Sequence, residues 1–198
     1  MKKLYPLIAG LMLCACSKKD ISPLLAFSDA KQNDFIKYTI PAGHQYCDQS
    51  TYIPIDFSEL KFTARFDSSA IYHTLDPINQ FDINKLYGFS DNNSGHHSYS
   101  ARFGWRWSQN ALRLFGYTYN NGVRESKELG IVKIGVENNC SIKIAMHQYY
   151  FTLNGITDSM ERSSTTGHAL GYKLYPYFGG DELAPHEINI WIKESLDH

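Results

Sequence analysis

The sequence predicts an all-β protein built as a single β-sandwich, a jelly roll with one or two short helices. Three observations carry this prediction: apolar and polar residues alternate with period two, turn-forming pairs separate the alternating runs, and helical periodicity is almost absent. Alternation indicates strands with one buried and one exposed face. Many short strands joined by frequent turns are typical of a sandwich or jelly roll.

Four runs show the alternation most clearly. Their apolar positions are Leu60, Phe62, Ala64 and Phe66; Leu112 and Leu114; Ile142, Ile144 and Met146; and Ile188, Ile190 and Ile192. Successive side chains of a strand point to opposite faces of the sheet, so we expect these residues to face the core.

Turns and one helix complete the expected pattern. Asn121-Gly122 lies between two strand-like runs and predicts a hairpin, and Asn154-Gly155 and Gly179-Gly180 are further turn signals. The clearest helical segment runs from Asp76 to Leu86, with Asp76 as N-cap and a proline in the first turn.

The first residues resemble a bacterial lipoprotein signal. Two lysines precede an apolar run from Leu4 to Ala15, which is shorter than the roughly 20 residues that cross a bilayer as a helix. Leu13-Cys14-Ala15-Cys16 resembles a lipobox, which implies cleavage before Cys16 and lipid on that cysteine; the alternative is an ordinary secretory signal. We therefore expect a signal peptide over 1–15, a lipidated tether over 16–35 and a β-sandwich over 36–198. The expected location is the bacterial outer membrane, facing the periplasm or the cell surface.

Charge and composition limit the partners. Removal of residues 1–15 takes away Lys2 and Lys3, which leaves 17 basic residues against 20 acidic ones and no basic run. Nucleic acid is excluded as a partner on this ground, because its binding needs clustered Lys and Arg. Aromatic residues are abundant, with 14 Tyr, 11 Phe and 3 Trp.

Two cysteines remain after Cys14 leaves with the signal and Cys16 takes lipid. In an oxidising export compartment Cys47 and Cys140 predict a disulfide, worth about 4–5 kcal/mol in the chain-entropy model. The alternative is two buried free thiols.

The C-terminal third, from Gly171 to Ile188, resembles the closing strands of concanavalin-like jelly rolls in Bacteroidota lipoproteins. The matching features are the Tyr177-Phe178-Gly179-Gly180 strand end and the Ala184-Pro185-His186 turn before a final alternating strand. Segment 100–105 fits the same architecture. Related folds include laminin-G-like modules, lectins, glycoside hydrolases and polysaccharide lyases, so the resemblance raises the expectation of a carbohydrate ligand without proving it.

The side chains opposite the apolar sets predict a ligand-binding groove. Aromatic rings stack on sugar C–H faces, while cationic groups bind hydroxyls or carboxylates. The groove candidates are Phe115, Tyr117, Tyr119, Lys143, Lys173, Tyr177 and Trp191. The alternative is that these aromatics pack beneath loops or lie on the convex face.

The residues allow two kinds of catalysis to be compared with what each reaction needs. β-Elimination on a uronic-acid polymer needs a base, a proton donor and a cation, for which His147, Tyr175 and Arg113 are the candidates. Tyr172-Lys173-Leu174-Tyr175 resembles only part of the Tyr-x-Lys-x-Gly motif of alginate-lyase-type jelly rolls. Glycoside hydrolysis needs a carboxylate pair, and no Glu-x-Asp-x-x-Glu cluster is present.

No metal or other cofactor is expected. The segment from Asp91 to His97 offers oxygen ligands for a structural Ca²⁺ near Asp91, but a polar turn accounts for it better, and adjacent His96 and His97 would point to opposite faces of a strand.

These observations favour a membrane-anchored lipoprotein whose sandwich binds glycans or assembles with envelope proteins without catalysis. The alternatives are a lyase acting on a uronic-acid polymer and a structural subunit. The expected partners are the membrane, through the lipid anchor, and a polysaccharide or envelope protein.

Overall fold

The computed structural model describes residues 34–195, and these residues belong to one compact unit. The signal peptide, the lipid on Cys16 and most of the tether lie outside the described residues and stay predictions. Within the described part, no helix has the length and apolar character needed to span a membrane.

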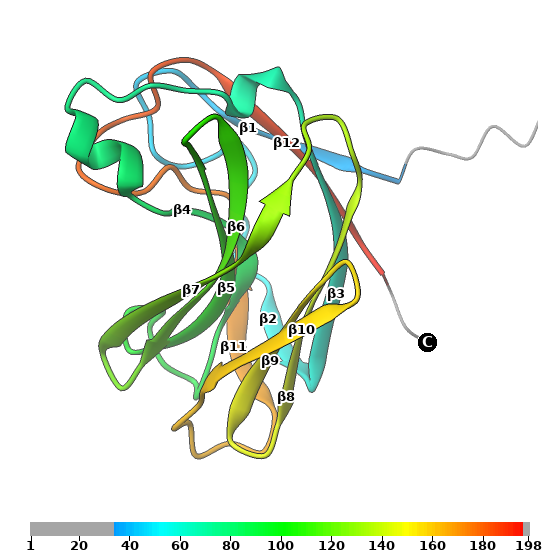
Figure 1. Cartoon of the computed structure of the whole chain (residues 1–198). Helices are drawn as coiled ribbons and strands as arrows, with labels where there is room; N and C mark the ends of the chain where they lie inside the picture. Colours follow the sequence, from blue (N-terminus) through cyan, green and yellow to red (C-terminus); the bar gives the residue numbers. More distant parts are fainter. Residues whose placement is uncertain (1–33, 196–198) are drawn as a thin grey trace, which may run out of the picture. The chain divides into compact units, whose positions relative to one another are not determined.

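Two six-stranded sheets form the sandwich, as the sequence predicts (Figure 1). The first sheet has the order β1 (Ile36–Ile40), β12 (Ile188–Glu194), β3 (Glu59–Phe66), β8 (Asn138–Ala145), β9 (Gln148–Leu153) and β10 (Ile156–Glu161). The second has the order β2 (Pro54–Phe57), β11 (Ala169–Leu174), β4 (Asn84–Ser90), β5 (Tyr99–Ser108), β6 (Ala111–Asn120) and β7 (Val123–Val132). All neighbouring strands are antiparallel, and pairs such as β12 with β3 and β11 with β4 join strands that are far apart in the sequence, as in a jelly roll.

The core lies between the sheets and is strongly aromatic. The alternation is confirmed in β3, where every second residue from Leu60 to Phe66 is buried, and in β12, where Ile188, Ile190 and Ile192 are buried. Phe103 of the second sheet meets Phe62 of the first edge to face at 5.5 Å. Such pairs add roughly 0.5–1.5 kcal/mol each to the burial of their apolar area.

The turn predictions are confirmed, and the helix is shorter than expected. Asn121 and Gly122 both have positive φ in the β6–β7 turn, as a tight hairpin turn of the primed type requires. Asp76 caps a 3-10 helix, Pro77–Phe81, by accepting from the Ile78 amide. The helix ends there because strand pairing begins at Asn84, and Leu86 is buried in β4.

The predicted disulfide is wrong. Cys47 and Cys140 are both free and buried, and each thiol donates to a nearby carbonyl oxygen, that of Gln49 at 3.3 Å and that of Asn138 at 3.7 Å. Cys140 faces the core from β8, while Cys47 lies in the β1–β2 loop, so the polar neighbours in sequence are not their neighbours in space. Burial raises the pKa of the Cys47 thiol to about 11 and raises that of Cys140 further.

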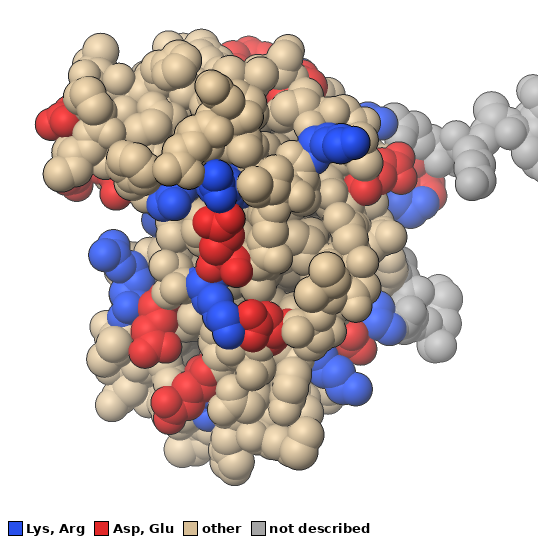
Figure 2. Space-filling model, viewed as in Figure 1, with Lys and Arg blue, Asp and Glu red and all other residues tan. Residues whose placement is uncertain are grey.

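Both signs of charge are interspersed on the face seen in Figure 2. Lys127 of β7 pairs with Asp158 of β10 at 2.6 Å, and Arg113 of β6 pairs with Glu128 of β7 at 2.7 Å. Exposed pairs of this kind contribute about 0–1 kcal/mol. These surface cations have carboxylate partners, whereas the two cations of the cavity described below form no salt bridge within residues 34–195.

Gly88 marks a close approach of β4 to β5. A Cβ on Gly88 would lie 2.2 Å from the Ala101 carbonyl oxygen and 2.6 Å from the Arg102 Cα, and neither backbone atom can move aside cheaply. We expect Gly88→Ala to lower the free energy of unfolding by about 1–3 kcal/mol in a denaturant titration. Gly95→Ala is the matched control, because nothing lies within 4 Å of its Cβ, and its unfolding should be unchanged or slightly improved. Equal unfolding curves for the two variants would contradict this account of the β4–β5 contact.

Candidate active site

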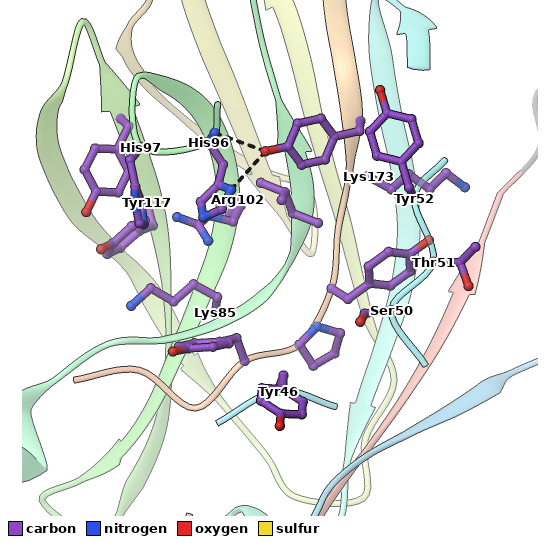
Figure 3. A pocket seen from close by; sticks show the side chains of 16 residues that line it. Tyr46, Ser50, Thr51, Tyr52, Lys85, His96, His97, Arg102, Tyr117 and Lys173 are labelled. Atoms are coloured by element: carbon purple, nitrogen blue, oxygen red, sulfur yellow. Dashed lines mark hydrogen bonds between the residues drawn. The ribbon is translucent and has the colours of Figure 1, made fainter. Parts of the chain in front are cut away.

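A cavity of about 470 Å³ opens on the outer face of the second sheet (Figure 3). Its floor comes from β4, β5 and β6, one wall from β11 and the residues after it, and the other parts of its rim from the β1–β2 and β4–β5 loops. The lining residues used below are Tyr46, Tyr52, Lys85, His96, Arg102, Tyr117 and Tyr172.

His96 and Tyr172 form a hydrogen-bonded pair at the edge of this cavity. The His96 Nδ1 atom lies 3.0 Å from the Tyr172 hydroxyl, and the His96 amide donates to the same oxygen at 3.3 Å. Because the hydroxyl oxygen already accepts from the amide, its proton is free to point at Nδ1. Burial, then the charges of Arg102 and His97, lower the pKa of His96 to about 4. The imidazole is therefore neutral at neutral pH and able to accept a proton.

Arg102 brings a buried positive charge to the cavity floor. The residue is 6% exposed, and its Nε atom has no hydrogen-bond partner among the described residues. The guanidinium lies 5.2 Å from the centre of the Tyr117 ring. Burial lowers the pKa of Arg102, because removal from water disfavours the charged form.

Lys85 adds a second cation close to the Tyr117 ring. Its Nζ lies 4.8 Å from the Tyr117 ring centre and donates to the Ile83 carbonyl oxygen at 2.8 Å. Burial first, and then the charges of Arg102 and Arg124, lower the pKa of Lys85 to about 8. Lys85 also lines an adjoining cavity of about 250 Å³ together with Arg106 and Arg124.

No Asp or Glu lies among the residues that line the 470 Å³ cavity. The third cation in its wall, Lys173, is neutralised by Glu194 at 2.5 Å from outside the cavity. Neither Arg102 nor Lys85 forms a salt bridge within the described part of the chain, and the carboxylate whose charge acts on Lys85, that of Asp82, lines the adjoining cavity instead. Two desolvated cations without a salt bridge attract an anion, and the tyrosines around them provide rings and hydroxyls suited to a sugar.

Two exposed tyrosines stand at the rim. Tyr46 is 62% and Tyr52 is 72% exposed, and the Tyr52 ring lies 5.3 Å from that of Tyr172. Exposed rings beside a cavity are available to stack on a saccharide. Figure 3 shows Tyr52 and Tyr46 at different ends of the drawn group.

The groove candidates from the sequence divide between the two outer faces of the sandwich. Tyr117, Tyr119, Lys173 and Tyr177 line the cavity, as does Tyr175. Lys143 and Trp191 belong to the first sheet, where Trp191 lies under Arg65. Phe115 is buried beneath Arg106 and lines neither cavity. Period-two alternation cannot tell one outer face from the other, so the sequence predicts residues of both faces as one groove.

The three catalytic candidates are not brought together. His147 is exposed in the β8–β9 turn with a φ of 57°, and Arg113 is occupied by Glu128 at 2.7 Å and Gln109 at 2.9 Å. Of the three, only Tyr175 lines the cavity. The lyase hypothesis cannot rest on that trio.

Sequence reasoning missed the group that the structure does assemble: His96, Arg102, Lys85 and Tyr172. One signal was available for Arg102, a charged residue inside the apolar stretch of β5, because charges are rarely buried without a role. His96 and Tyr172 are 76 residues apart in the chain, and no pattern links them.

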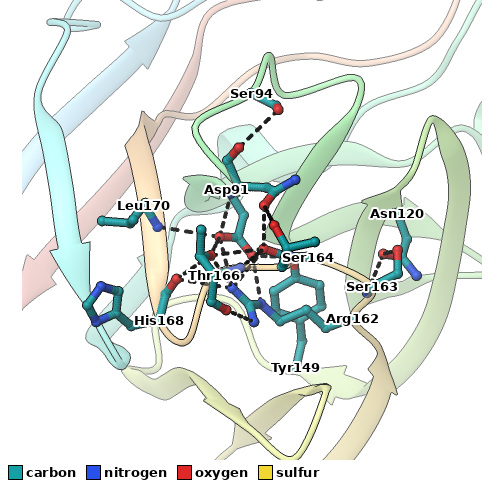
Figure 4. Close-up of polar contacts among 12 residues, drawn as sticks. Asp91, Ser94, Asn120, Tyr149, Arg162, Ser163, Ser164, Thr166, His168 and Leu170 are labelled. Atoms are coloured by element: carbon teal, nitrogen blue, oxygen red, sulfur yellow. Dashed lines mark hydrogen bonds and ion pairs between the residues drawn. The ribbon is translucent and has the colours of Figure 1, made fainter.

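The Asp91 carboxylate is held by Arg162 at 2.7 Å and by the Tyr149 hydroxyl at 2.7 Å, both buried (Figure 4). A calcium ion at Asp91 does not fit this arrangement, because the guanidinium already occupies the place of the cation. Among the described residues no group of three or more potential ligands could hold a metal.

Comparisons with known proteins identify the fold. No family model matches the chain, and no curated protein matches it in sequence. Alginate lyase AlyC3 is similar in structure with a TM-score of 0.58 at 9% identity, over 83% of this chain and 75% of that one. A family 16 endo-glucanase from Bacteroides ovatus gives a TM-score of 0.53 at 9% identity, over 81% and 80%. The catalytic domain of an endo-1,3-β-glucanase from Thermotoga petrophila gives 0.52 at 10%, over 81% and 75%.

The chain therefore has the jelly-roll fold of family 16 glycoside hydrolases and alginate lyases. These comparisons contradict the expectation of a non-catalytic glycan-binding or surface-assembly module, because the similar structures are polysaccharide-degrading enzymes. At such low identity the likeness concerns the fold, and the reaction has to be argued from the site.

Proposed function

We propose that this chain is a polysaccharide lyase that cleaves a uronic-acid polymer by β-elimination. The observation that carries the proposal is the charge of the cavity: Arg102 is buried and Lys85 is half-buried, neither forms a salt bridge among the described residues, and no Asp or Glu is among the residues that line the cavity. A uronate carboxylate is the sugar substituent that complements these cations.

The same observation argues against glycoside hydrolysis. That reaction uses two carboxyl groups about 5–9.5 Å apart on either side of the scissile bond. The cavity's lining residues include neither of them. The hydrolases of this fold are therefore a weaker guide to the reaction than the lyases.

β-Elimination fits the groups that are present. In this reaction a base removes the proton from C5 of the uronate, the electron pair of that bond forms the C4–C5 double bond, and the bond from C4 to the bridging oxygen breaks. The leaving oxygen takes up a proton, so that no water is consumed. The His96–Tyr172 pair is suited to both proton transfers, since neutral His96 accepts and the Tyr172 hydroxyl can donate.

Arg102 and Lys85 are placed to stabilise the negative charge that develops during the reaction. Removal of the C5 proton delocalises negative charge onto the carboxylate of the sugar. Fixed donors in a water-poor site stabilise such charge more strongly than solvent does. Arg102 is already desolvated and held beneath Tyr117, so it needs little reorganisation when the substrate arrives.

The test is a screen of the intact protein against charged and neutral polymers. Alginate, pectate and glucuronan supply uronates, and laminarin supplies a neutral β-glucan. The proposal expects ultraviolet absorbance from the new conjugated double bond with at least one polyuronate and none with laminarin. Release of reducing ends from laminarin, with no reaction on any polyuronate, would contradict it.

The pH dependence of kcat/KM follows from the two lowered pKa values. His96 must be neutral to accept a proton, and its pKa of about 4 places the acid limb near pH 4. Lys85 must be charged to bind the carboxylate, and its pKa of about 8 places the alkaline limb near pH 8, above which the charge is lost. We expect a plateau between these limbs, and Lys85→Met should remove the alkaline limb while the acid limb stays. An acid limb near about 6.5, the ordinary value of histidine, would contradict the role of buried His96.

A further inference from the structure

The loop that carries His96 has a buried anchor at its base. Residues 91–98 join β4 to β5, and Asp91, the first of them, is fully buried. Its carboxylate accepts from Arg162 Nε at 2.7 Å and Nη2 at 3.2 Å, from the Tyr149 hydroxyl at 2.7 Å and from the Leu170 amide at 3.4 Å. Figure 4 shows these contacts converging on Asp91.

Arg162 organises a second loop with the rest of its guanidinium. Its remaining donors reach the Thr166 carbonyl oxygen at 2.7 Å, the His168 carbonyl oxygen at 3.1 Å and the Ser164 hydroxyl at 3.0 Å. These acceptors all belong to the 162–168 connection between β10 and β11. The planar guanidinium of arginine has enough donors to reach these acceptors and Asp91 together, whereas the ammonium group of lysine does not.

The two loops are joined to each other above this ion pair. The Asn92 side-chain oxygen accepts from the Ser164 hydroxyl at 3.1 Å and from the Thr165 amide at 3.1 Å. The Asn93 amide donates to the Leu170 carbonyl oxygen at 2.7 Å. The 91–98 loop is thereby held in register with the start of β11.

β11 also carries Tyr172, two residues beyond Leu170. The Tyr172 amide donates to the Ser90 hydroxyl at 2.9 Å, so the strand is fixed to the end of β4 as well. At the far end of the loop, the Ser100 hydroxyl donates to the His96 carbonyl oxygen at 2.7 Å. The distance between His96 Nδ1 and the Tyr172 hydroxyl depends on both attachments.

We propose that Asp91 and Arg162 are positioning residues, and that their buried ion pair holds the 91–98 loop against β11 so that His96 and Tyr172 share a hydrogen bond. This inference rests on the proposed function for its catalytic consequence. Its geometric content, the placement of His96, stands without any substrate. A pair that served stability alone would not need hydrogen bonds to both segments that carry the two groups.

The test compares Arg162→Lys with Tyr149→Phe in the full chain. Arg162→Lys keeps the charge but loses the forked contacts, so the loop shifts; displacements of about 1 Å can cost about 10²-fold in rate. We expect kcat to fall by about tenfold to a hundredfold with KM changed less than about threefold. Tyr149→Phe removes one hydrogen bond to Asp91 and leaves both loop attachments, so its kcat and pH profile should stay as in the wild type.

The decisive readout is the titration of the His96 imidazole, followed by NMR in the intact protein. The groups that face it are Arg102 of β5, Tyr172 of β11 and His97 of its own loop, and the cavity is further lined by Lys85 of β4 and by Tyr117 and Tyr119 of β6. In Arg162→Lys we expect the midpoint to rise from about 4 toward the ordinary value of about 6.5, because His96 leaves its desolvated place beside Arg102. In Tyr149→Phe it should stay at about 4.

A second variant keeps the inference testable if Arg162→Lys does not fold. Asn92→Gly preserves the positive φ of 57° and removes only the acceptor that joins the loops. It should shift the His96 midpoint in the same direction by a smaller amount. A folded Arg162→Lys or Asn92→Gly variant with an unchanged His96 midpoint overturns the inference. Because this readout needs no polymer, it is independent of whether the wild type cleaves one, which the polyuronate screen decides.

Discussion

Replacing Arg102 with methionine is expected to lower kcat/KM on a polyuronate by about 10²–10³-fold, because one fixed donor to the developing carboxylate charge is lost. The same change should leave the free energy of unfolding unchanged or raise it. Arg102 is buried with an unpartnered Nε, and an apolar side chain of similar volume removes an uncompensated charge from the free protein. A gain in stability together with a loss of activity is the signature of a binding group held at a cost to folding.

Arg113→Met provides the matched control for this prediction. Arg113 lies on neighbouring β6, but its guanidinium is satisfied by Glu128 and Gln109 and does not line the cavity. Its kcat/KM should change less than about twofold, since surface changes away from such features are usually within about 0.5 kcal/mol. Equal losses in the two variants, or an Arg102→Met protein that is active and less stable, would remove Arg102 from its proposed role.

Removal of either member of the His96–Tyr172 pair is expected to lower kcat by about 10²–10⁴-fold, the range of general acid–base catalysis. His96→Ala removes the proton acceptor, and Tyr172→Phe removes the hydroxyl while keeping the ring beneath Tyr52. Because the two groups share a hydrogen bond and act in the same reaction, their effects should not add. The double variant should be about as slow as the slower single variant.

His147→Ala is the control for the histidine, because His147 is an exposed residue of the β8–β9 turn. Its rate should equal that of the wild type. A loss at His147 with normal rates in both His96→Ala and Tyr172→Phe would show that the reaction takes place outside the cavity described here.

Much of the fold could be predicted from the sequence, because strands of the first sheet have one apolar and one polar face. In β3 and β12 one face meets the core and the other meets solvent, so alternation reveals both the strand and its buried side. The sheet that bears the cavity gives a weaker signal. β4 is buried at six of its seven positions, which removes the alternation, so that the sequence predicts its first residues as the end of a helix.

The site was harder to predict for a related reason. Arg102 and Lys85 stand on strands that are mostly buried, and their importance comes from the absence of a carboxylate in the lining of the cavity, which only the fold reveals. His96 meets Tyr172 through a loop whose course depends on Asp91 and Arg162, 71 residues apart. Aromatic and cationic residues on alternating strands did indicate a sugar-binding face, and Tyr117, Tyr119, Lys173 and Tyr177 do line the cavity.

The most direct test of the central claim is the mass of the product formed in water labelled with heavy oxygen. Elimination consumes no water, so the account predicts product pairs in which one member carries a double bond at its non-reducing end and neither has gained label by cleavage. The oxygen at the reducing end exchanges slowly with water, so the reaction is kept brief. Unlabelled product incubated in the same labelled water measures the remaining exchange. Saturated products with one labelled oxygen per cleaved bond would mean hydrolysis, and would contradict a lyase built on Arg102, His96 and Tyr172.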